Sequence, residues 1–252
     1  MGTVASASRL WLDHVSLVVP DVASASVELE SRWGLRVTPT PADHRHHGRI
    51  HLDRAYIEVS DGEPTEDWRL SHFWFLRFED PERLRAHLAA SGLEFSFGVY
   101  EGRDGRWDDV SVSAGAVPLP ILVRRTSPPD VARDWPPTLR HAHPCSAVTL
   151  EAVHVTVPDL HEAVDAYSRL LGVPADSRRA EADATARFRL DGGEIVLTHG
   201  RKPGLAAFVA GVESLEPARK NIAGLGYTNP PWVDPARAPG LSVGFLEVRA
   251  RR

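Results

Sequence analysis

The segment LDHVSLVVPD at residues 12–21 recurs as LEAVHVTVPD at residues 150–159, and this repeat decides how the chain is organised. Five of the ten positions hold the same residue, at a constant offset of 138 positions. The glycine pairs that keep the same offset are Gly34 with Gly172 and Gly62 with Gly200. A constant offset over such a length is typical of a duplicated structural unit. The sequence therefore predicts two similar domains and a proline-rich linker, at residues 9–125, 148–252 and 126–147 respectively.

Each half of the chain divides further into two modules with one shared pattern. A stretch of alternating apolar residues leads to a residue suited to cap a helix, and a glycine suited to end that helix follows 12 or 13 positions later. The caps are Asp21, Asp80, Asp159 and Ser214, and the glycines are Gly34, Gly92, Gly172 and Gly226. Strand candidates follow each helix, at residues 35–39, 48–53 and 55–60, then 93–100, 107–113 and 119–125, then 173–177, 185–190 and 193–198, and finally 241–249. This pattern predicts an α+β fold of two tandem domains, each made of paired βαβββ modules.

The composition excludes several classes of function. The net charge is −5 at pH 7 and the isoelectric point is about 6.2, so we expect no surface that attracts nucleic acid or an anionic membrane. The sequence contains no apolar run of the roughly 18 residues that a membrane-spanning helix needs. Cys145 is the single cysteine, which excludes a disulfide within the chain. We expect a cytoplasmic protein, a monomer or a homodimer, that acts on a small-molecule substrate.

Four βαβββ modules that open with LDHVSLVVPD and close the first module with AYIEVSDG at 55–62 resemble the vicinal-oxygen-chelate superfamily. That superfamily includes glyoxalase I, extradiol dioxygenases and drug-resistance proteins. The segments HRHHGRIHLDRAYIEV at 44–59, FWFLRFED at 73–80 and LPILVRR at 119–125 are similar to its glyoxalase-like members. The resemblance implies the glyoxalase fold and a divalent metal cofactor, which is Zn, Fe, Mn or Ni.

The resemblance also implies which residues form the metal site. Ligands in this superfamily come from the first and last strands of a module, and His14 and Glu58 occupy such positions. Imidazole and carboxylate groups are ligands that these metals accept. His72 is the candidate third ligand, although counting back from the helix cap places its neighbour Phe73 opposite His14. Glu58 is in addition the candidate catalytic residue, as a group that moves a proton.

Several residues close to these ligands are candidate substrate contacts. They are His44, His51, Tyr56, Trp74 and Phe75. Arg49 and His51 stand where the glyoxalase-like pattern has Thr and Asn. Histidines in this stretch either bind an anionic part of a substrate or face solvent. The two aromatic residues at 74 and 75 either line an apolar pocket or pack in the core.

The second half lacks the corresponding ligands. At the offset of 138 positions, Ala152 takes the place of His14 and Val196 takes that of Glu58, while His154 and Glu247 remain as a possible pair. The resemblance thus implies a metalloenzyme of the lyase or isomerase type whose site lies in the first half. An Fe(II)-dependent dioxygenase is one alternative, and a metal-free protein that binds a drug-like molecule is the other.

Overall fold

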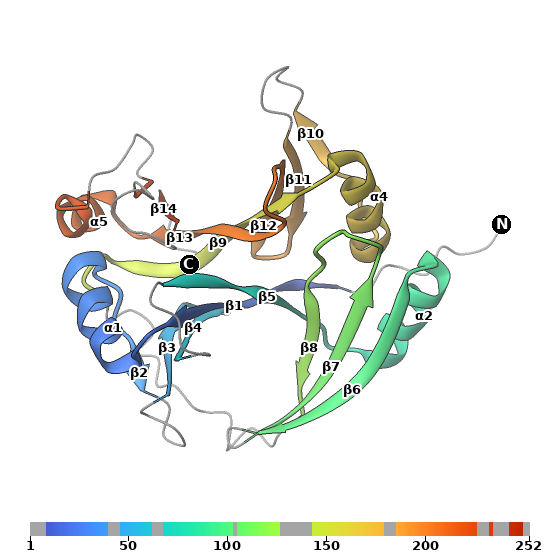
Figure 1. Cartoon of the computed structure of the whole chain (residues 1–252), viewed down its shortest axis with the longest axis horizontal. Coiled ribbons are helices and arrows are strands. Elements are labelled where there is room, and N and C mark those ends of the chain that lie inside the picture. The colour runs from blue at the N-terminus through green and yellow to red at the C-terminus, as the bar shows by residue number, and fades with distance from the viewer. Residues whose placement is uncertain are drawn as a thin grey trace. The chain divides into compact units, whose positions relative to one another are not determined.

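The computed structural model describes residues 9–39, 46–61, 68–102, 105–126, 143–178, 185–225, 232–233 and 242–248. The prediction of an α+β fold is confirmed, because the described strands form two sheets and helices connect them (Figure 1). None of the helices in these ranges is long and apolar enough to cross a membrane.

The elements follow the chain in repeated order. Those of the first half are β1 (Trp11–Val19), α1 (Val22–Glu28), β2 (Thr38–Pro39), β3 (His47–His51), β4 (Tyr56–Asp61), β5 (Arg69–Arg77), α2 (Pro81–Ser91), β6 (Glu94–Gly102), β7 (Gly105–Ser113) and β8 (Ile121–Arg125). Those of the second half are β9 (Ala147–Val157), α4 (Leu160–Leu171), β10 (Asp176–Arg178), β11 (Thr185–Leu190), β12 (Gly193–His199), β13 (Gly204–Val212), α5 (Leu215–Ile222) and β14 (Val243–Glu247).

The helices begin at the predicted caps. Each cap side chain accepts a hydrogen bond from a backbone N–H two or three residues later: Asp21 from Ser24, Asp80 from Arg83, Asp159 from Glu162 and Ser214 from Glu216. Three predicted glycines, Gly34, Gly92 and Gly172, end their helices in the left-handed conformation with φ of 67–68°. The fourth helix ends earlier than predicted, at Ile222, because the Leu225 N–H donates to the Ile222 carbonyl at 2.9 Å and turns the chain. Gly226 itself lies outside the described residues.

The first helix changes its geometry before it ends. α1 stops at Glu28, and Leu29–Trp33 continue as a π-helix. This wider turn buries the side chains of both Leu29 and Trp33 almost completely. The Leu35 N–H then donates to the Leu29 carbonyl at 2.9 Å, which closes the helix. Both ends of the π-turn thus pack in the core.

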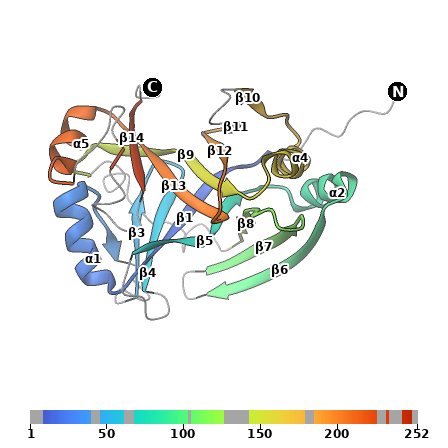
Figure 2. The ribbon, with the colours of Figure 1, turned by 45° about the horizontal axis from the view of Figure 1, so that its top comes forward.

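The strands form one sheet in the order β2-β3-β4-β1-β5-β8-β7-β6 and another in the order β10-β11-β12-β9-β13-β14. Each sheet is built from one of the two repeated halves. In three modules the first and last strands pair in parallel: β1 with β4, β5 with β8, and β13 with β14. β6 and β7 form a long antiparallel ribbon (Figure 2).

The contacts of the chain divide it into two compact units. Unit 1 contains residues 1–13, 73–127 and 154–205, and unit 2 contains residues 14–72, 128–153 and 206–252. Each unit combines parts of both halves. The domain limits inferred from the repeat, 9–125 and 148–252, thus follow the two sheets and differ from these units. The division into two domains at these limits stays a prediction.

Unit 1 is held together by aromatic packing and by a helix pair. The rings of Trp74 and Tyr167 stack with their centroids 6.4 Å apart, and both side chains are buried. The Tyr167 hydroxyl donates to the Pro118 carbonyl at 2.6 Å. α2 lies beside α4 (Figure 1), where a ring nitrogen of His87 is 2.9 Å from the Leu170 carbonyl oxygen. These contacts join segments that are far apart in the sequence.

Candidate functional site

Strand alternation separates polar from apolar side chains on β1 of unit 2. Val15 and Leu17 are buried in the core, with at most 1% of their surface exposed, and they alternate with His14 and Ser16. Backbone pairing with β4 then sets His14 opposite Tyr56 and Ser16 opposite Glu58. The predicted ligands His14 and Glu58 therefore come from the same face of adjacent strands.

Strand β3 extends this face on the other side of β4. Arg49 pairs with Glu58 and His51 pairs with Tyr56, so residues 47, 49 and 51 share the face of residues 56 and 58. We call this surface the polar face. It consists of His14, Ser16, His47, Arg49, His51, Tyr56 and Glu58. The structure thus brings together four of the predicted site residues, which are His14, His51, Tyr56 and Glu58.

Glu58 lies at the centre of the polar face. The Ser16 hydroxyl donates to its Oε2 at 2.9 Å, and Nδ1 of His47 lies 3.7 Å from its Oε1. Burial raises the pKa of Glu58, but the nearby His47, the charge of His14 and the hydrogen bond from Ser16 outweigh it and lower that pKa to about 2. Glu58 is therefore an ionised carboxylate at neutral pH.

The ring of Tyr56 contacts two basic side chains, those of His14 and Arg49. The imidazole of His14 stacks on its ring, with the centroids 4.4 Å apart and the planes at 11°. The guanidinium carbon of Arg49 lies 4.8 Å from the same ring centroid. His14 and Arg49 are each 7% exposed, and His51 is 6% exposed. Buried polar groups need hydrogen bonds or paired charges around them. A cluster of such groups is typical of a functional site.

The other predicted site residues lie elsewhere or outside the described part. His44 and the side chain of His72 are outside the described residues, although the backbone of His72 belongs to β5. Trp74 is 1% exposed and packs on Tyr167 in the core of unit 1, so the structure does not place it on an open pocket wall. Phe75 follows it on β5, partly exposed and paired with Ile121.

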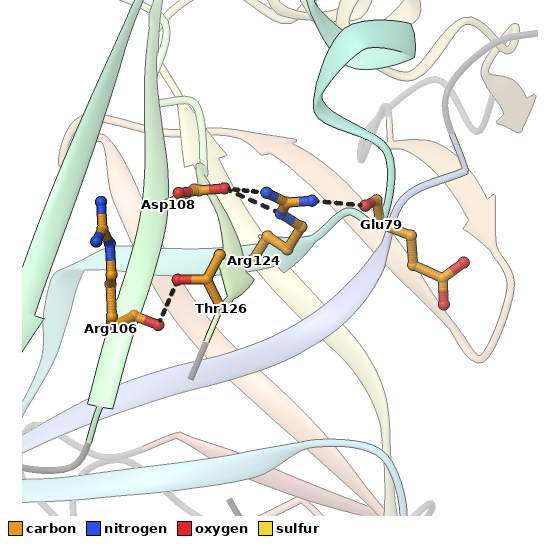
Figure 3. Close-up of polar contacts among 5 residues, drawn as sticks. All are labelled: Glu79, Arg106, Asp108, Arg124 and Thr126. Carbon is orange, nitrogen blue, oxygen red and sulfur yellow. Dashed lines mark hydrogen bonds and ion pairs between the residues drawn. The ribbon is translucent and has the colours of Figure 1, made fainter. Parts of the chain in front are cut away.

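In β8, the last strand of the second module, Ile121 pairs with Phe75, and the charged residue Arg124 lies three positions further along. Arg124 on β8 forms a two-pronged ion pair with Asp108 on β7, with nitrogen–oxygen distances of 2.9 and 2.5 Å. A third nitrogen of Arg124 donates to the Glu79 carbonyl, and the Thr126 hydroxyl donates to the Arg106 carbonyl (Figure 3). The carboxylate of Asp108 is thus paired with Arg124, and these contacts link β8 to β7 and to the chain at Glu79.

The pair that remains in the second half serves other roles. The carboxylate of Glu247 accepts a hydrogen bond from the Leu215 N–H at the start of α5. Burial, together with the charge of Arg187, lowers the pKa of His154 to about 4. A nearby guanidinium disfavours a bound cation. Ala152 and Val196, at the positions of the lost ligands, are buried in the apolar core.

The donors of the polar face fit a divalent ion in chemistry, and they are incomplete in number. Within the described ranges, no group of three or more His, Cys, Asp and Glu side chains is arranged to hold a metal ion. His14 and Glu58 supply one imidazole and one ionised carboxylate, whereas metal sites with open positions use three protein ligands. A complete site would need a further donor, and His72 remains the candidate.

Ser16 and His47 are partners of Glu58 that the sequence did not predict. Ser16 follows His14 by two residues in β1. Because side chains alternate along a strand, the sequence alone places both on one face. Whether Ser16 lies opposite Glu58 depends on the register between strands whose residues are 42 positions apart in the sequence. That register cannot be read from one sequence.

His143 is a second missed residue, and it supports the strand that carries the polar face. Its Nδ1 accepts a hydrogen bond from the Arg36 N–H at 3.0 Å, so its Nε2 carries the proton and donates to the His51 carbonyl at 2.7 Å. His143 is 6% exposed and lies four residues before β9. It therefore fixes the end of β3 from a distant part of the chain.

We expect His143→Ala to lower the free energy of unfolding by about 2 kcal/mol, because it leaves two backbone groups without these hydrogen bonds. Urea unfolding followed by tryptophan fluorescence measures the loss. The matched control is His87→Ala, which removes a single partly exposed contact with Leu170 and should cost less than about 1 kcal/mol. Equal losses in the two variants would contradict the role given to His143.

More than half of the chain matches a known protein family. Residues 12–171 match the family model of the glyoxalase-like domain. No curated protein matches the sequence.

Several solved structures share the fold. A hypothetical protein from Staphylococcus aureus is 11% identical, with a TM-score of 0.65, over 94% of this chain and 99% of that chain. A variant of homoprotocatechuate 2,3-dioxygenase from Brevibacterium fuscum is 13% identical, with a TM-score of 0.65, over 99% of this chain and 75% of that chain. BphC, a halotolerant catechol dioxygenase, is 16% identical, with a TM-score of 0.59, over 97% of this chain and 90% of that chain. These dioxygenases belong to the vicinal-oxygen-chelate superfamily, and at such identities the likeness shows the fold alone.

Proposed function

The chain belongs to the glyoxalase-like domain family, within the vicinal-oxygen-chelate superfamily, and from this premise we propose that it is a metal-dependent enzyme acting on a small oxygen-bearing molecule. One observation carries the proposal. His14 and the ionised Glu58 lie on one face of adjacent strands, at the positions to which the superfamily resemblance assigns ligands. The reaction we favour is of the lyase or isomerase type.

Three residues would hold the metal ion. His14 and Glu58 are the first two ligands, and His72 is the candidate third. A divalent ion bound there would polarise the oxygens of the substrate as a Lewis acid. Ser16 keeps the carboxylate of Glu58 oriented through its hydrogen bond to Oε2, and this bond leaves Oε1 on the side of His47.

Glu58 and His47 differ in their suitability for metal binding and for proton transfer. A pKa near 2 makes Glu58 a weak base, so its environment favours the role of ligand over that of proton acceptor. The side chain of His47 is 44% exposed and lies 3.7 Å from Oε1 of Glu58. An imidazole is suited to take up and return a proton near neutral pH. We therefore assign proton transfer to His47 and the role of metal ligand to Glu58, for which the sequence predicts both roles.

Metal binding tests the proposal directly. Purified protein, freed of metal and titrated with Zn²⁺, Mn²⁺ or anaerobic Fe²⁺ in a calorimeter, should bind one ion per chain. His14→Ala and Glu58→Gln should each weaken binding by at least about tenfold, because each removes a ligand. The control is Glu194→Gln, which removes a carboxylate that pairs with Arg187 in unit 1.

Absence of binding to the wild-type protein would sink the proposal. So would binding that Glu58→Gln leaves unchanged while the circular dichroism spectrum confirms that the variant is folded.

A metal-free binding protein is the second candidate function. It is favoured by the finding that the described residues contain no three-ligand group. In that case small apolar or polar compounds should raise the melting temperature equally with and without a chelator. Ring-cleaving dioxygenation is the alternative reaction for the metal site, and oxygen uptake with homoprotocatechuate and Fe²⁺ would reveal it.

A further inference from the structure

Residues 143–148 form a tight turn that leads into β9. The Ser146 N–H donates to the His143 carbonyl at 2.8 Å, which closes a turn with Pro144 at its second position. Proline fixes φ near the value that this position of a turn requires. His143 is 6% exposed and Cys145 is fully buried, so the side chains on both sides of Pro144 are packed inside unit 2. We call residues 143–148 the strap.

The side chain of His143 attaches the strap to the end of β3. Its imidazole donates to the His51 carbonyl at 2.7 Å and accepts a hydrogen bond from the Arg36 N–H at 3.0 Å. His51 is the last residue of β3 and belongs to the polar face. One buried side chain of the strap thus contacts two separate segments of the first half.

Two backbone hydrogen bonds add to this attachment. The Cys145 N–H donates to the Gly34 carbonyl at 3.1 Å, and the Asp53 N–H donates to the Val148 carbonyl at 2.6 Å. Asp53 lies in the turn between β3 and β4, the two strands that carry most of the polar face. The strap therefore holds this face at the end where the two strands turn.

The strap is also bound to the second half of the chain. The Ser146 hydroxyl donates to the Ser214 carbonyl at 3.1 Å and accepts from the Ser214 N–H at 3.2 Å. The Ser146 carbonyl accepts from the Glu213 N–H at 3.0 Å. Because Ser214 caps α5, these bonds fix the strap to the junction of β13 and α5.

Ser146 has an unfavourable backbone conformation that these bonds maintain. Its φ is +57°, a left-handed value that no other described residue with a side chain adopts. Such a conformation costs free energy and persists only where surrounding contacts hold it. The hydrogen bonds to Glu213 and Ser214 are contacts of this kind. Their loss would free Ser146 to leave this conformation and would shift the strap with it.

We propose that the strap couples the second half to the polar face, so that release of Ser146 from the β13–α5 junction also loosens the turn between β3 and β4. A continuous set of hydrogen bonds joins the two ends, from Ser214 through Ser146 and His143 to His51. The second half, which has lost the corresponding ligands, thus keeps a role at the site. This inference concerns how the polar face is held, and it depends on neither the metal nor the reaction.

Hydrogen exchange of individual amides, followed by NMR in the full-length protein without metal or substrate, tests the coupling. Ser146→Ala removes the hydroxyl and keeps a side chain at positive φ. We expect the amides of Arg36 and Asp53 to exchange at least about fivefold faster in this variant, because lost hydrogen bonds favour local opening. Faster exchange confined to Glu213 and Ser214, with Arg36 and Asp53 unchanged, overturns the proposal.

Ser91→Ala is the matched control. The Ser91 hydroxyl also donates to a backbone carbonyl, that of Leu88 at 2.7 Å, and accepts from a backbone N–H, that of Leu93 at 3.3 Å. It lies at the end of α2 in unit 1, so its loss should leave the two first-half amides unchanged. The amides of α2 are the internal reference for Ser146→Ala. Equal acceleration there would indicate global unfolding and contradict a local coupling.

Two further variants complete the test. Ser146→Gly removes the same hydroxyl but tolerates positive φ, so exchange at Asp53 should lie between the wild type and Ser146→Ala, even where the latter folds poorly. Because coupling is reciprocal, His143→Ala should also speed exchange at Glu213, on the other side of the strap. Faster exchange at Asp53 but wild-type exchange at Glu213 in His143→Ala would show two independent attachments and overturn the coupling.

Discussion

Gly34→Ala is expected to lower the free energy of unfolding by about 3 kcal/mol, the sum of a strained backbone and a steric overlap. Gly34 has a φ of +68°, which L-residues with a side chain rarely adopt. A Cβ at this position would lie 2.7 Å from the backbone nitrogen of Cys145 and 2.8 Å from its Cβ. Backbone cannot move aside as a flexible side chain can. The Gly34 carbonyl also accepts a hydrogen bond from the Cys145 N–H at 3.1 Å, so the two segments cannot separate without losing it.

Gly92→Ala is the matched control for this substitution. Gly92 ends α2 with the same φ of +68°, and a Cβ there would meet nothing within 4 Å. It should therefore cost about 1 kcal/mol, the backbone part alone. Urea unfolding of both variants measures the difference. Equal shifts of the two midpoints would show that the close contact with Cys145 contributes nothing.

Cys145 is expected to react with a thiol reagent at pH 8 at least about 1,000-fold more slowly than an exposed cysteine, because the thiolate is the reacting form. Burial raises the pKa of Cys145 from 9.0 to about 12, and its side chain has no exposed surface. Labelling with a chromogenic disulfide and comparison with free cysteine gives the ratio. In 8 M urea the same residue should react at the rate of free cysteine. Urea serves here as the positive control.

Labelling of Cys145 also reports on its contact with Gly34. Gly34→Ala pushes against the backbone of Cys145, so the native variant should react faster than the native wild type, whereas Gly92→Ala should not. Rapid stoichiometric labelling of the native wild-type protein would contradict the buried position of the thiol.

Much of the fold could be predicted because its signals are local. The caps at Asp21, Asp80 and Asp159 and the glycines that follow depend on a few neighbouring residues, and the structure confirms them. The π-turn at Leu29–Trp33 could not be predicted in this way. Gly34 and Gly172 both lie 13 residues after their caps, yet the helix before Gly172 is α-helical to Leu171. The equal spacing of cap and glycine therefore does not distinguish the two helix geometries.

In the candidate site, too, the local features could be predicted and the contacts between distant segments could not. The period of two in strands was enough to place His14 with Ser16 and Tyr56 with Glu58 on shared faces, and their hydrogen bond and ring stacking agree with it. The same period argues against Trp74 and Phe75 as joint walls of one pocket, since consecutive residues of a strand point to opposite faces. Partners from distant segments, such as His143 for β3, depend on how the chain folds back.

The assembly of each compact unit from separate stretches of chain has a consequence for biosynthesis. Unit 1 has its last segment as soon as Leu205 has left the ribosome, whereas unit 2 also needs residues from Ala206 onward. The strands that carry His14 and Glu58 are therefore among the first made, but the unit around them is completed among the last. Nascent chains that stall before Ala206 would expose the partly built unit 2 to chaperones and proteases.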